Sequence, residues 1–178
     1  MANYTQGLIL DTFESMLEHM PFDKITVTAL IKQCNIGRNT FYYHYADIYA
    51  LLDEWLHIKV GELTSTQDSA RWQDLLKNAL YTCRDNKRKI YNVYTSLSRD
   101  RLENYLFGQA DGLIADFVVA AGEKKGAQPE RVKTIASIME YTVFGFFLRF
   151  LHDGMKGDIE TSVDNLGSVL DEILEKLL

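Results

Sequence analysis

Apolar residues recur at helical spacing along most of the chain, while proline, which interrupts helices, occurs only twice in 178 residues. Near the N-terminus, Ile9, Phe13 and Met16 begin one such stripe, and Pro21 ends the helix. Near the C-terminus, apolar residues from Ile159 to Leu177 are separated alternately by four and three positions. The sequence shows no strand-like alternation and no internal repeat. These features predict an all-α fold.

Turn residues divide this helical chain into segments. Four helices are expected in the first third, over residues 4–20, 26–34, 38–45 and 47–63. A polar linker at residues 64–69 precedes further helices, which we expect over 70–84, 88–97, 99–122, 129–153 and 158–177. The segments predict an N-terminal domain at residues 1–46 and a C-terminal domain at residues 47–178, connected by the helix at 47–63.

A short helix, a tight turn and a second short helix occupy residues 26–45. Thr26 is a favourable N-cap for the first of these helices. Asn35 tolerates the left-handed conformation that ends a helix, and Gly37 can precede the second helix, which runs from Arg38 to about Tyr45. This order of elements predicts a helix-turn-helix, in which the second helix enters the major groove of DNA.

The second helix carries side chains suited to reading DNA. Arginine can bond guanine, asparagine can bond adenine, and the threonine methyl group can contact thymine. Tyrosine and histidine can donate to phosphate oxygens. Phe41 and Tyr45 lie four residues apart and are expected to face inward. The candidate DNA-binding residues are Thr26, Thr28, Arg38, Asn39, Thr40, Tyr42, Tyr43 and His44.

The runs at residues 22–31, 36–45 and 48–52 resemble the DNA-binding domain of the TetR family of transcription regulators. That family shows an F-x-x-I-T-V-x-x-I run followed by a G-V-S-x-x-T-[FL]-Y-x-[HY]-F recognition helix, and the match covers roughly residues 5–56. The resemblance implies a nine-helix regulator that is a homodimer, with a DNA-binding domain at residues 1–46 and an effector-binding and dimerisation domain at 47–178. The second domain binds a ligand or a partner and dimerises through its last two helices. The run from Thr40 to Leu52 is also similar to the subgroup of dihydroxyacetone kinase operon regulators, some of which activate through a protein partner.

Charge in the N-terminal segment departs from the family pattern. Residues 1–56 hold three basic and seven acidic residues, a net charge of −4, and neither the N-terminal arm nor the start of the fourth helix carries the usual lysine or arginine. Non-specific DNA affinity is therefore expected to be low. We expect a ligand-responsive repressor of a palindromic operator, in which an effector shifts the population between dimer spacings through the fourth helix. The alternatives are an activator that recruits a protein partner and a helical interaction module without DNA binding.

The last two expected helices carry apolar stripes wider than one partner helix needs. A four-helix interface between two subunits would cover them, and burial inside a monomer is the alternative. The candidate dimer residues are Ile138, Phe146, Phe150, Val163, Leu166, Leu170, Ile173 and Leu177.

Tyrosines of the C-terminal segment are candidate effector-binding residues, namely Tyr91, Tyr94, Tyr105 and Tyr141, with core packing as the alternative. The basic cluster at 84–89 can be a solvated helix end or a surface near DNA or a partner. Glu54 and His57 form one Glu-x-x-His pair, and a di-iron bundle needs two, so we expect no metal and no cofactor. Without catalytic motifs, a signal peptide or an apolar run of bilayer length, the sequence predicts a cytoplasmic protein that is not an enzyme and does not bind membranes.

Overall fold

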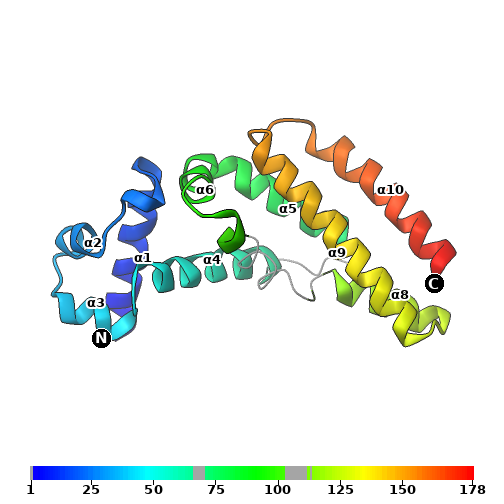
Figure 1. The fold of residues 1–178 in the computed structure, drawn as a ribbon, viewed down its shortest axis with the longest axis horizontal. Helices are drawn as coiled ribbons and strands as arrows, with labels where there is room; N and C mark the ends of the chain where they lie inside the picture. Colours follow the sequence, from blue (N-terminus) through cyan, green and yellow to red (C-terminus); the bar gives the residue numbers. More distant parts are fainter. Residues whose placement is uncertain (1, 66–70, 103–111, 113) are drawn as a thin grey trace. The chain divides into compact units, whose positions relative to one another are not determined.

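The computed structural model describes residues 2–65, 71–102, 112 and 114–178 (Figure 1). Every regular element within these residues is a helix, as the sequence predicts. The elements are α1 (Ala2–His19), η1 (Phe22–Lys24), α2 (Val27–Cys34), α3 (Arg38–His44), α4 (Ile48–Ser65), α5 (Trp72–Asp85), α6 (Lys87–Tyr94), α8 (Ala115–Lys125), α9 (Pro129–His152) and α10 (Ile159–Leu177).

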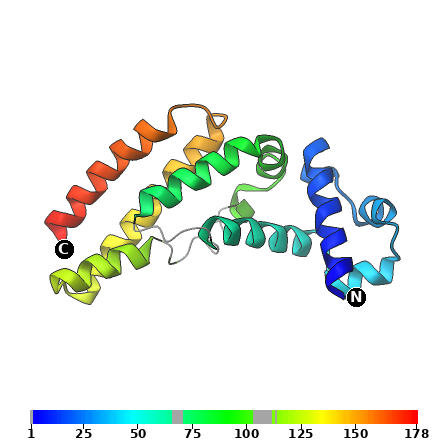
Figure 2. The same cartoon turned by 180° about the vertical axis from the view of Figure 1, so that it is seen from behind.

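The chain forms two compact units. The first contains residues 1–62 and 86–105, and the second contains residues 63–85 and 106–178. In the first unit, α2 and α3 lie beside α1, as Figure 2 shows from behind. The core of this unit is aromatic, because the ring of Phe13 meets the edges of Phe22 and Trp55 at centroid distances of 6.1 and 6.3 Å. Such edge-to-face pairs stabilise a core beyond the area that they bury.

The first unit extends past the predicted boundary at residue 46. Residues 86–105 join it because α6 packs along α1, with Val93 buried in the same core and Ile90 and Leu97 against it. Asn92 Nδ2 donates to the backbone oxygen of Leu17 at 2.7 Å. The compact units therefore divide the chain differently from the proposed functional domains, since α6 lies far from α1 in sequence.

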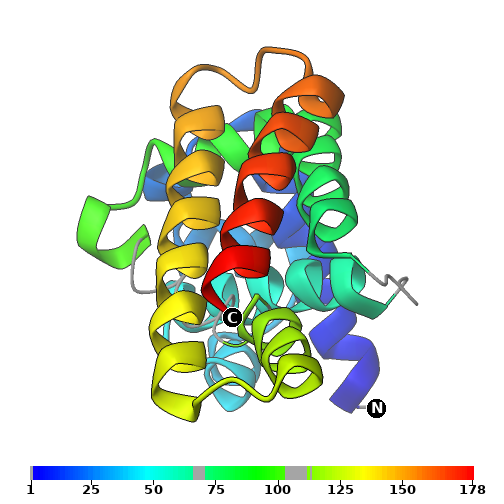
Figure 3. The ribbon, with the colours of Figure 1, turned by 90° about the vertical axis from the view of Figure 1, so that its right-hand side faces the viewer.

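The second unit is built from α5, α8, α9 and α10. Figure 3 shows α9 and α10 side by side and running in opposite directions, and both helices also contact α5. Two glycines permit close approach of helices: a Cβ at Gly122 of α8 would lie 2.5 Å from Val132 Cγ2, and one at Gly167 of α10 would lie 2.8 Å from Gln73 Cγ. The core of this unit includes Leu80, Met139 and Val163, which are fully buried.

Two helical expectations change in this unit. The helix expected at 99–122 is interrupted, because Gly112 lies in a turn with a φ of +86° and α8 begins at Ala115. Helix α9 has 24 residues and a window of mean hydropathy 1.3, so by length and composition it is the one described helix that could cross a membrane. The sequence, which has no unbroken apolar run of bilayer length, did not indicate this. A core helix also passes this test, and α9 packs on α5, α8 and α10.

Candidate nucleic-acid interface

Helix α2 starts and ends as its sequence predicts. Thr26 has an extended backbone, and its hydroxyl oxygen accepts a hydrogen bond from Ala29 N at 3.1 Å. A capping bond of this kind satisfies one of the donors left over at a helix start and stabilises the helix by about 1 kcal/mol. Leu30 and Cys34 bury the inner face of this short helix, so packing adds to the cap.

The turn between α2 and α3 depends on one left-handed residue. Asn35 has φ 54° and ψ 45°, and its N–H bonds Lys32 O at 3.3 Å. The next residue, Ile36, donates from its N–H to Ile31 O at 3.0 Å. These two bonds form a Schellman motif, which ends α2 and turns the chain within three residues. The expectation that Asn35 supplies the left-handed position is confirmed.

Helix α3 is held from one side and exposed on the other. Phe41 is fully buried and Tyr45, at the end of the helix, is 4% exposed, as predicted for the inward pair. Their rings lie 5.7 Å apart. The opposite side presents Arg38, Asn39, Tyr42 and Tyr43, all of which are exposed, with Tyr43 at 79%. Thr40 and His44 are half-buried at the edges of this face.

Ring contacts arrange the exposed side chains of α3. The guanidinium carbon of Arg38 lies 6.0 Å from the centre of the Tyr42 ring, one turn further along. The rings of Tyr43 and His44 meet edge to face at 5.1 Å. Thr28 is exposed, and so is Thr26, whose hydroxyl also serves as the cap of α2. The arrangement offers hydroxyl, amide and guanidinium donors on one outward surface.

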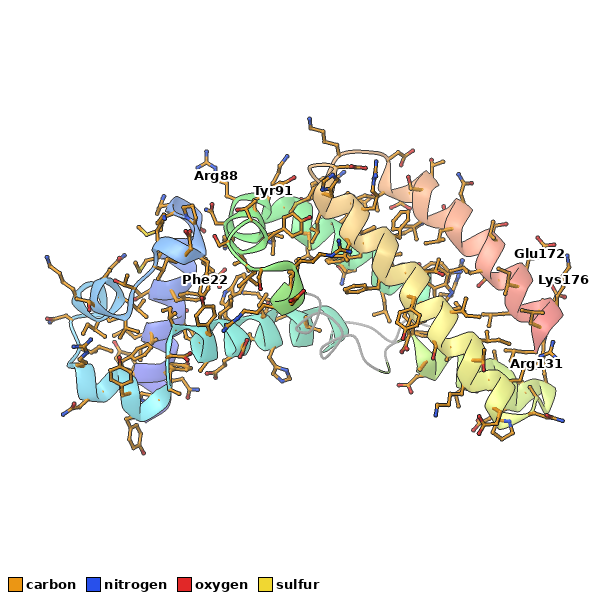
Figure 4. All side chains as sticks on the ribbon, in the orientation of Figure 1. Phe22, Arg88, Tyr91, Arg131, Glu172 and Lys176 are labelled. Atoms are coloured by element: carbon orange, nitrogen blue, oxygen red, sulfur yellow. The ribbon has the colours of Figure 1, made fainter. Side chains whose placement is uncertain are left out.

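The cations near this surface are few. Lys24 is paired with Asp23 at 3.0 Å, which leaves Lys32 and Arg38 as the other basic side chains of residues 1–56. The basic cluster does not add to them as a whole, because Lys89 bonds Glu14 at 2.6 Å and Glu18 at 3.3 Å. Figure 4 shows Arg88 extending away from α6. Directed hydrogen bonds, more than charge, are what this surface can offer to DNA.

Comparison with known proteins identifies the family to which this fold belongs. A family model described as the C-terminal region of transcriptional regulators, of the TetR type, matches residues 70–172. The chain belongs to the TetR family of transcriptional regulators. No curated protein sequence matches it. The family and the structural neighbours of this regulator are regulators and not enzymes.

Three solved structures share the fold of this TetR-family chain. A TetR transcriptional regulator from Streptococcus agalactiae is 24% identical, with a TM-score of 0.64 over 97% of this chain and 94% of that one. The dihydroxyacetone kinase operon activator DhaS is 20% identical, with a TM-score of 0.68 over 96% of each chain. The fatty acid degradation regulator FadR from Bacillus halodurans is 14% identical, with a TM-score of 0.65 over 93% of each chain.

The candidate dimer residues of the regulator fall into two groups. Phe150, Val163 and Leu170 are 8%, 0% and 3% exposed, because they pack against the chain's own helices, and they have almost no surface left for a partner. Phe146, Leu166 and Ile173 are half-buried, while Ile138 and Leu177 are 50% and 40% exposed. The spacing of apolar residues in the sequence did not separate these groups, because the same stripe supplies both buried core residues and residues on the outer surface of α9 and α10.

The candidate effector tyrosines differ in their exposure. Tyr141 is 65% exposed on the outer face of α9, and Tyr105 lies outside the described residues. Tyr91 and Tyr94 are half-buried on α6 with their rings 6.2 Å apart, and Figure 4 labels Tyr91 near Arg88. None of these three described tyrosines lines the pocket between α5, α9 and α10, which holds Leu80 and Phe146.

Sequence reasoning missed a polar centre that joins three helices of the first unit. Glu14 of α1 accepts from Trp55 Nε1 of α4 at 3.1 Å and from Lys89 of α6 at 2.6 Å, and its carboxylate lies 3.2 Å from Lys59. Burial acts to raise the pKa of Glu14, but these donors outweigh it and lower the pKa. No local signal marks such a contact, since its members are 41 and 75 positions from Glu14. Among the described residues, no group of three potential metal ligands occurs.

Proposed function

We propose that this TetR-family regulator binds a palindromic DNA operator as a homodimer, with one α3 in each of two successive major grooves. The outward side of α3, with Arg38, Asn39, Tyr42 and Tyr43 exposed over a buried Phe41, carries the proposal. Two-fold symmetric proteins of this kind place their recognition helices about 34 Å apart, one turn of DNA. Thr26, Thr28, Thr40 and His44 complete the proposed contact surface.

The dimer is proposed to form through the outer faces of α9 and α10. The exposed and half-buried members of the predicted stripe supply this surface, except Phe146, which lines a pocket, and two exposed neighbours join them, Tyr141 at 65% and Val169 at 58%. A Cβ at Gly145 of α9 would meet no atom within 4 Å, so a partner helix has room to approach there. The proposed dimer surface consists of Ile138, Tyr141, Leu166, Val169, Ile173 and Leu177.

Sedimentation velocity tests the dimer separately from DNA. Replacing Ile138 and Val169 together by glutamate puts two charges on each subunit's face, where the loss of apolar burial and the repulsion both oppose association. We expect the double variant to sediment as a monomer at concentrations where the wild type is a dimer. A Val119→Glu variant, altered at a 42% exposed valine of α8, is the control and is expected to stay dimeric.

A binding titration tests the proposed DNA contacts. Fluorescence anisotropy of a labelled duplex from upstream of the regulator's own gene measures affinity, and random DNA of equal length measures the non-specific background. Tyr42→Ala is expected to weaken binding about two- to tenfold, in line with about 0.5 to 1.5 kcal/mol for a hydrogen bond to a phosphate oxygen. Val119→Ala is the control. Equal affinity of the Tyr42→Ala and wild-type proteins would exclude α3 as the reading element, and absence of any specific site would favour an interaction module.

The sign of regulation has two candidates. We propose a ligand-responsive, cytoplasmic repressor, in which a ligand changes the operator affinity of the dimer. The second candidate, an activator acting through a protein partner, is favoured by the structural likeness to a protein named as an operon activator. A promoter fusion in a strain lacking the regulator separates them: expression rises if the regulator represses and falls if it activates.

A further inference from the structure

A pocket lies in the second unit where the end of α9 turns back into α10. Its cavity is about 150 Å³ and is lined from three helices. Leu80 of α5, Phe146 and Phe150 of α9 and Ile159 of α10 form its apolar wall. Arg149, Asp153, Lys156, Gly157, Asp158 and Ser162 form its polar rim.

The size and wall of this α9–α10 pocket suit one aromatic ring. An enclosed apolar protein cavity of about this volume accommodates benzene, and here the apolar wall forms the inner side of a pocket that opens to solvent at its polar rim. Leu80 is fully buried, and Ile159 and Phe150 are 3% and 8% exposed, so the inner wall belongs to the packed core.

The turn beside the pocket is held in an uncommon conformation. Met155 has a φ of +55°, which residues other than glycine rarely adopt. Gly154 before it and Gly157 two residues after it also have positive φ angles, +84° and +118°. Its side chain is 2% exposed, and its N–H donates to Phe150 O at 2.8 Å. The burial of Met155 and its bond to Phe150 therefore hold the turn that carries the rim residues Asp153, Lys156 and Gly157. Positions of this kind gather at ligand sites.

Some charged side chains on the rim are bonded to neighbouring residues, and one is exposed to solvent. Arg149 Nε donates to Asp153 Oδ2 at 2.6 Å, so these two charges offset one another. Asp158 caps α10, accepting from Thr161 N at 3.2 Å and from Thr161 Oγ1 at 2.5 Å. Lys156 is exposed at the mouth. Its ammonium is the rim charge best placed to meet a negative group on a ligand.

We propose that the α9–α10 pocket binds a small aromatic carboxylate, with the ring against Phe146 and Phe150 and the carboxylate toward Lys156 and Ser162. The binding itself goes beyond the proposed DNA recognition and does not depend on it. An uncharged aromatic of the same shape would keep the ring contacts and lose the ammonium contact.

Titration of the full-length chain with sodium benzoate, followed by amide ¹H–¹⁵N spectra at constant ionic strength, tests the site. We expect saturable shifts at Lys156, Gly157 and Ser162, with a dissociation constant on the order of 1 mM for so small a ligand. Benzamide, the neutral comparator, and the Lys156→Gln variant should each bind about threefold more weakly, since an exposed ion pair contributes little more than this. Lys124→Gln, which removes an exposed lysine of α8, is the matched control and should bind as the wild type does.

Three results would overturn the proposal. The first is the absence of saturable shifts in these residues. The second is equal binding of benzoate by the Lys156→Gln and Lys124→Gln variants. The third is equal binding of benzoate and benzamide by the wild type. Both lysines are exposed, so melting curves are expected to coincide and any change in affinity then belongs to the site.

Discussion

The α2–α3 pair and the α9–α10 pair are both helical hairpins, but they are stabilised differently. Helices α2 and α3 have eight and seven residues, and they depend on caps and on an aromatic core beneath them. Helices α9 and α10 have 24 and 19 residues, and aliphatic side chains between long helices hold them. In Figure 4, Glu172 and Lys176 of α10 project away from its neighbours.

This difference affects how function can be inferred from each pair. In α2–α3, Leu30, Cys34 and Phe41 are buried on the inner side, so most outward side chains of α3 do not hold the fold and their chemistry indicates a partner. In α9–α10 one apolar stripe supplies both the core and the outer flank, so composition does not identify the contact surface. A substitution should therefore separate fold from function in the first pair more cleanly than in the second.

The largest expected effect is at the inner side of α3. Phe41→Ala removes a fully buried ring, and we expect a loss of about 3 to 5 kcal/mol in the free energy of unfolding, measured by urea denaturation. Tyr43→Ala changes a neighbour that is 79% exposed and should cost less than about 0.5 kcal/mol. Comparable losses for the two variants would contradict the two-sided description of α3.

The next effect lies between α5 and α10. In Gly167→Ala the new methyl would meet Gln73 at 2.8 Å from Cγ and 2.9 Å from Nε2. Gln73 is 2% exposed, and its Nε2 donates to Asp171 Oδ2 at 2.7 Å, so it can yield only by giving up that bond. We expect a loss of about 1 to 3 kcal/mol by thermal or chemical denaturation.

Gly7 provides the control for this glycine. It lies within α1, and a Cβ there would meet no atom within 4 Å. Gly7→Ala should stabilise the chain by about 0.5 to 1 kcal/mol, because alanine favours a helix more than glycine does. If Gly7→Ala destabilised the chain as Gly167→Ala does, the close contact with Gln73 would not be needed to explain the loss at Gly167.

A smaller effect with a pH signature is expected at Glu14. Removing its charge in Glu14→Gln should cost about 1 to 2 kcal/mol at neutral pH, since Lys89 and Lys59 lose a charged acceptor. The pKa of Glu14 lies below its ordinary value of 4.5, so its contribution is present above that value and is lost as the pH falls through the lowered pKa. Denaturation midpoints measured from pH 7 down to pH 3 should therefore fall less steeply for the variant than for the wild type.

The smallest effect concerns a buried hydroxyl. Tyr45 is 4% exposed, and its hydroxyl has no hydrogen-bond partner among the described residues. Burial, together with the nearby Glu54 carboxylate, raises the pKa of this hydroxyl. Tyr45→Phe should be neutral or stabilising by up to about 1 kcal/mol, because it removes a desolvated polar group. Tyr81→Phe, which deletes a hydroxyl bonded to Glu160 at 2.7 Å, should be neutral or slightly destabilising by comparison.

The sequence predicts those parts of this fold that depend on neighbouring residues. The cap at Thr26, the left-handed Asn35 and the inward pair of Phe41 and Tyr45 all follow from chemistry within one or two turns. The cap of α4 is equally local, because Asp47 Oδ1 accepts from Tyr49 N and Ala50 N. The outward face of α3 follows from the same reasoning. The candidate DNA-binding residues could be named for that reason, although their contact with DNA stays a prediction.

Features formed between distant segments were not predictable in the same way. The period of α10 does not reveal that Val163 and Leu170 face the chain's own core while Val169 faces outward. The basic run at 84–89 does not reveal that Lys89 is matched to Glu14. The pocket beside Met155 is lined by residues of three helices, and the sequence does not show which residues of these helices meet. The amino-acid composition also does not indicate the positive φ of Met155.

The left-handed Asn35 has a consequence for how recognition can be altered. Asn35 sets the bend without help from any outward side chain of α3. Other residues can therefore replace Arg38 and Asn39 without disturbing the bend. The backbone of the helix-turn-helix then stays the same while the side chains that contact the bases change. New operator preferences should be obtainable by randomising these positions alone, whereas inserting a single residue beside Asn35 would misdirect the whole helix.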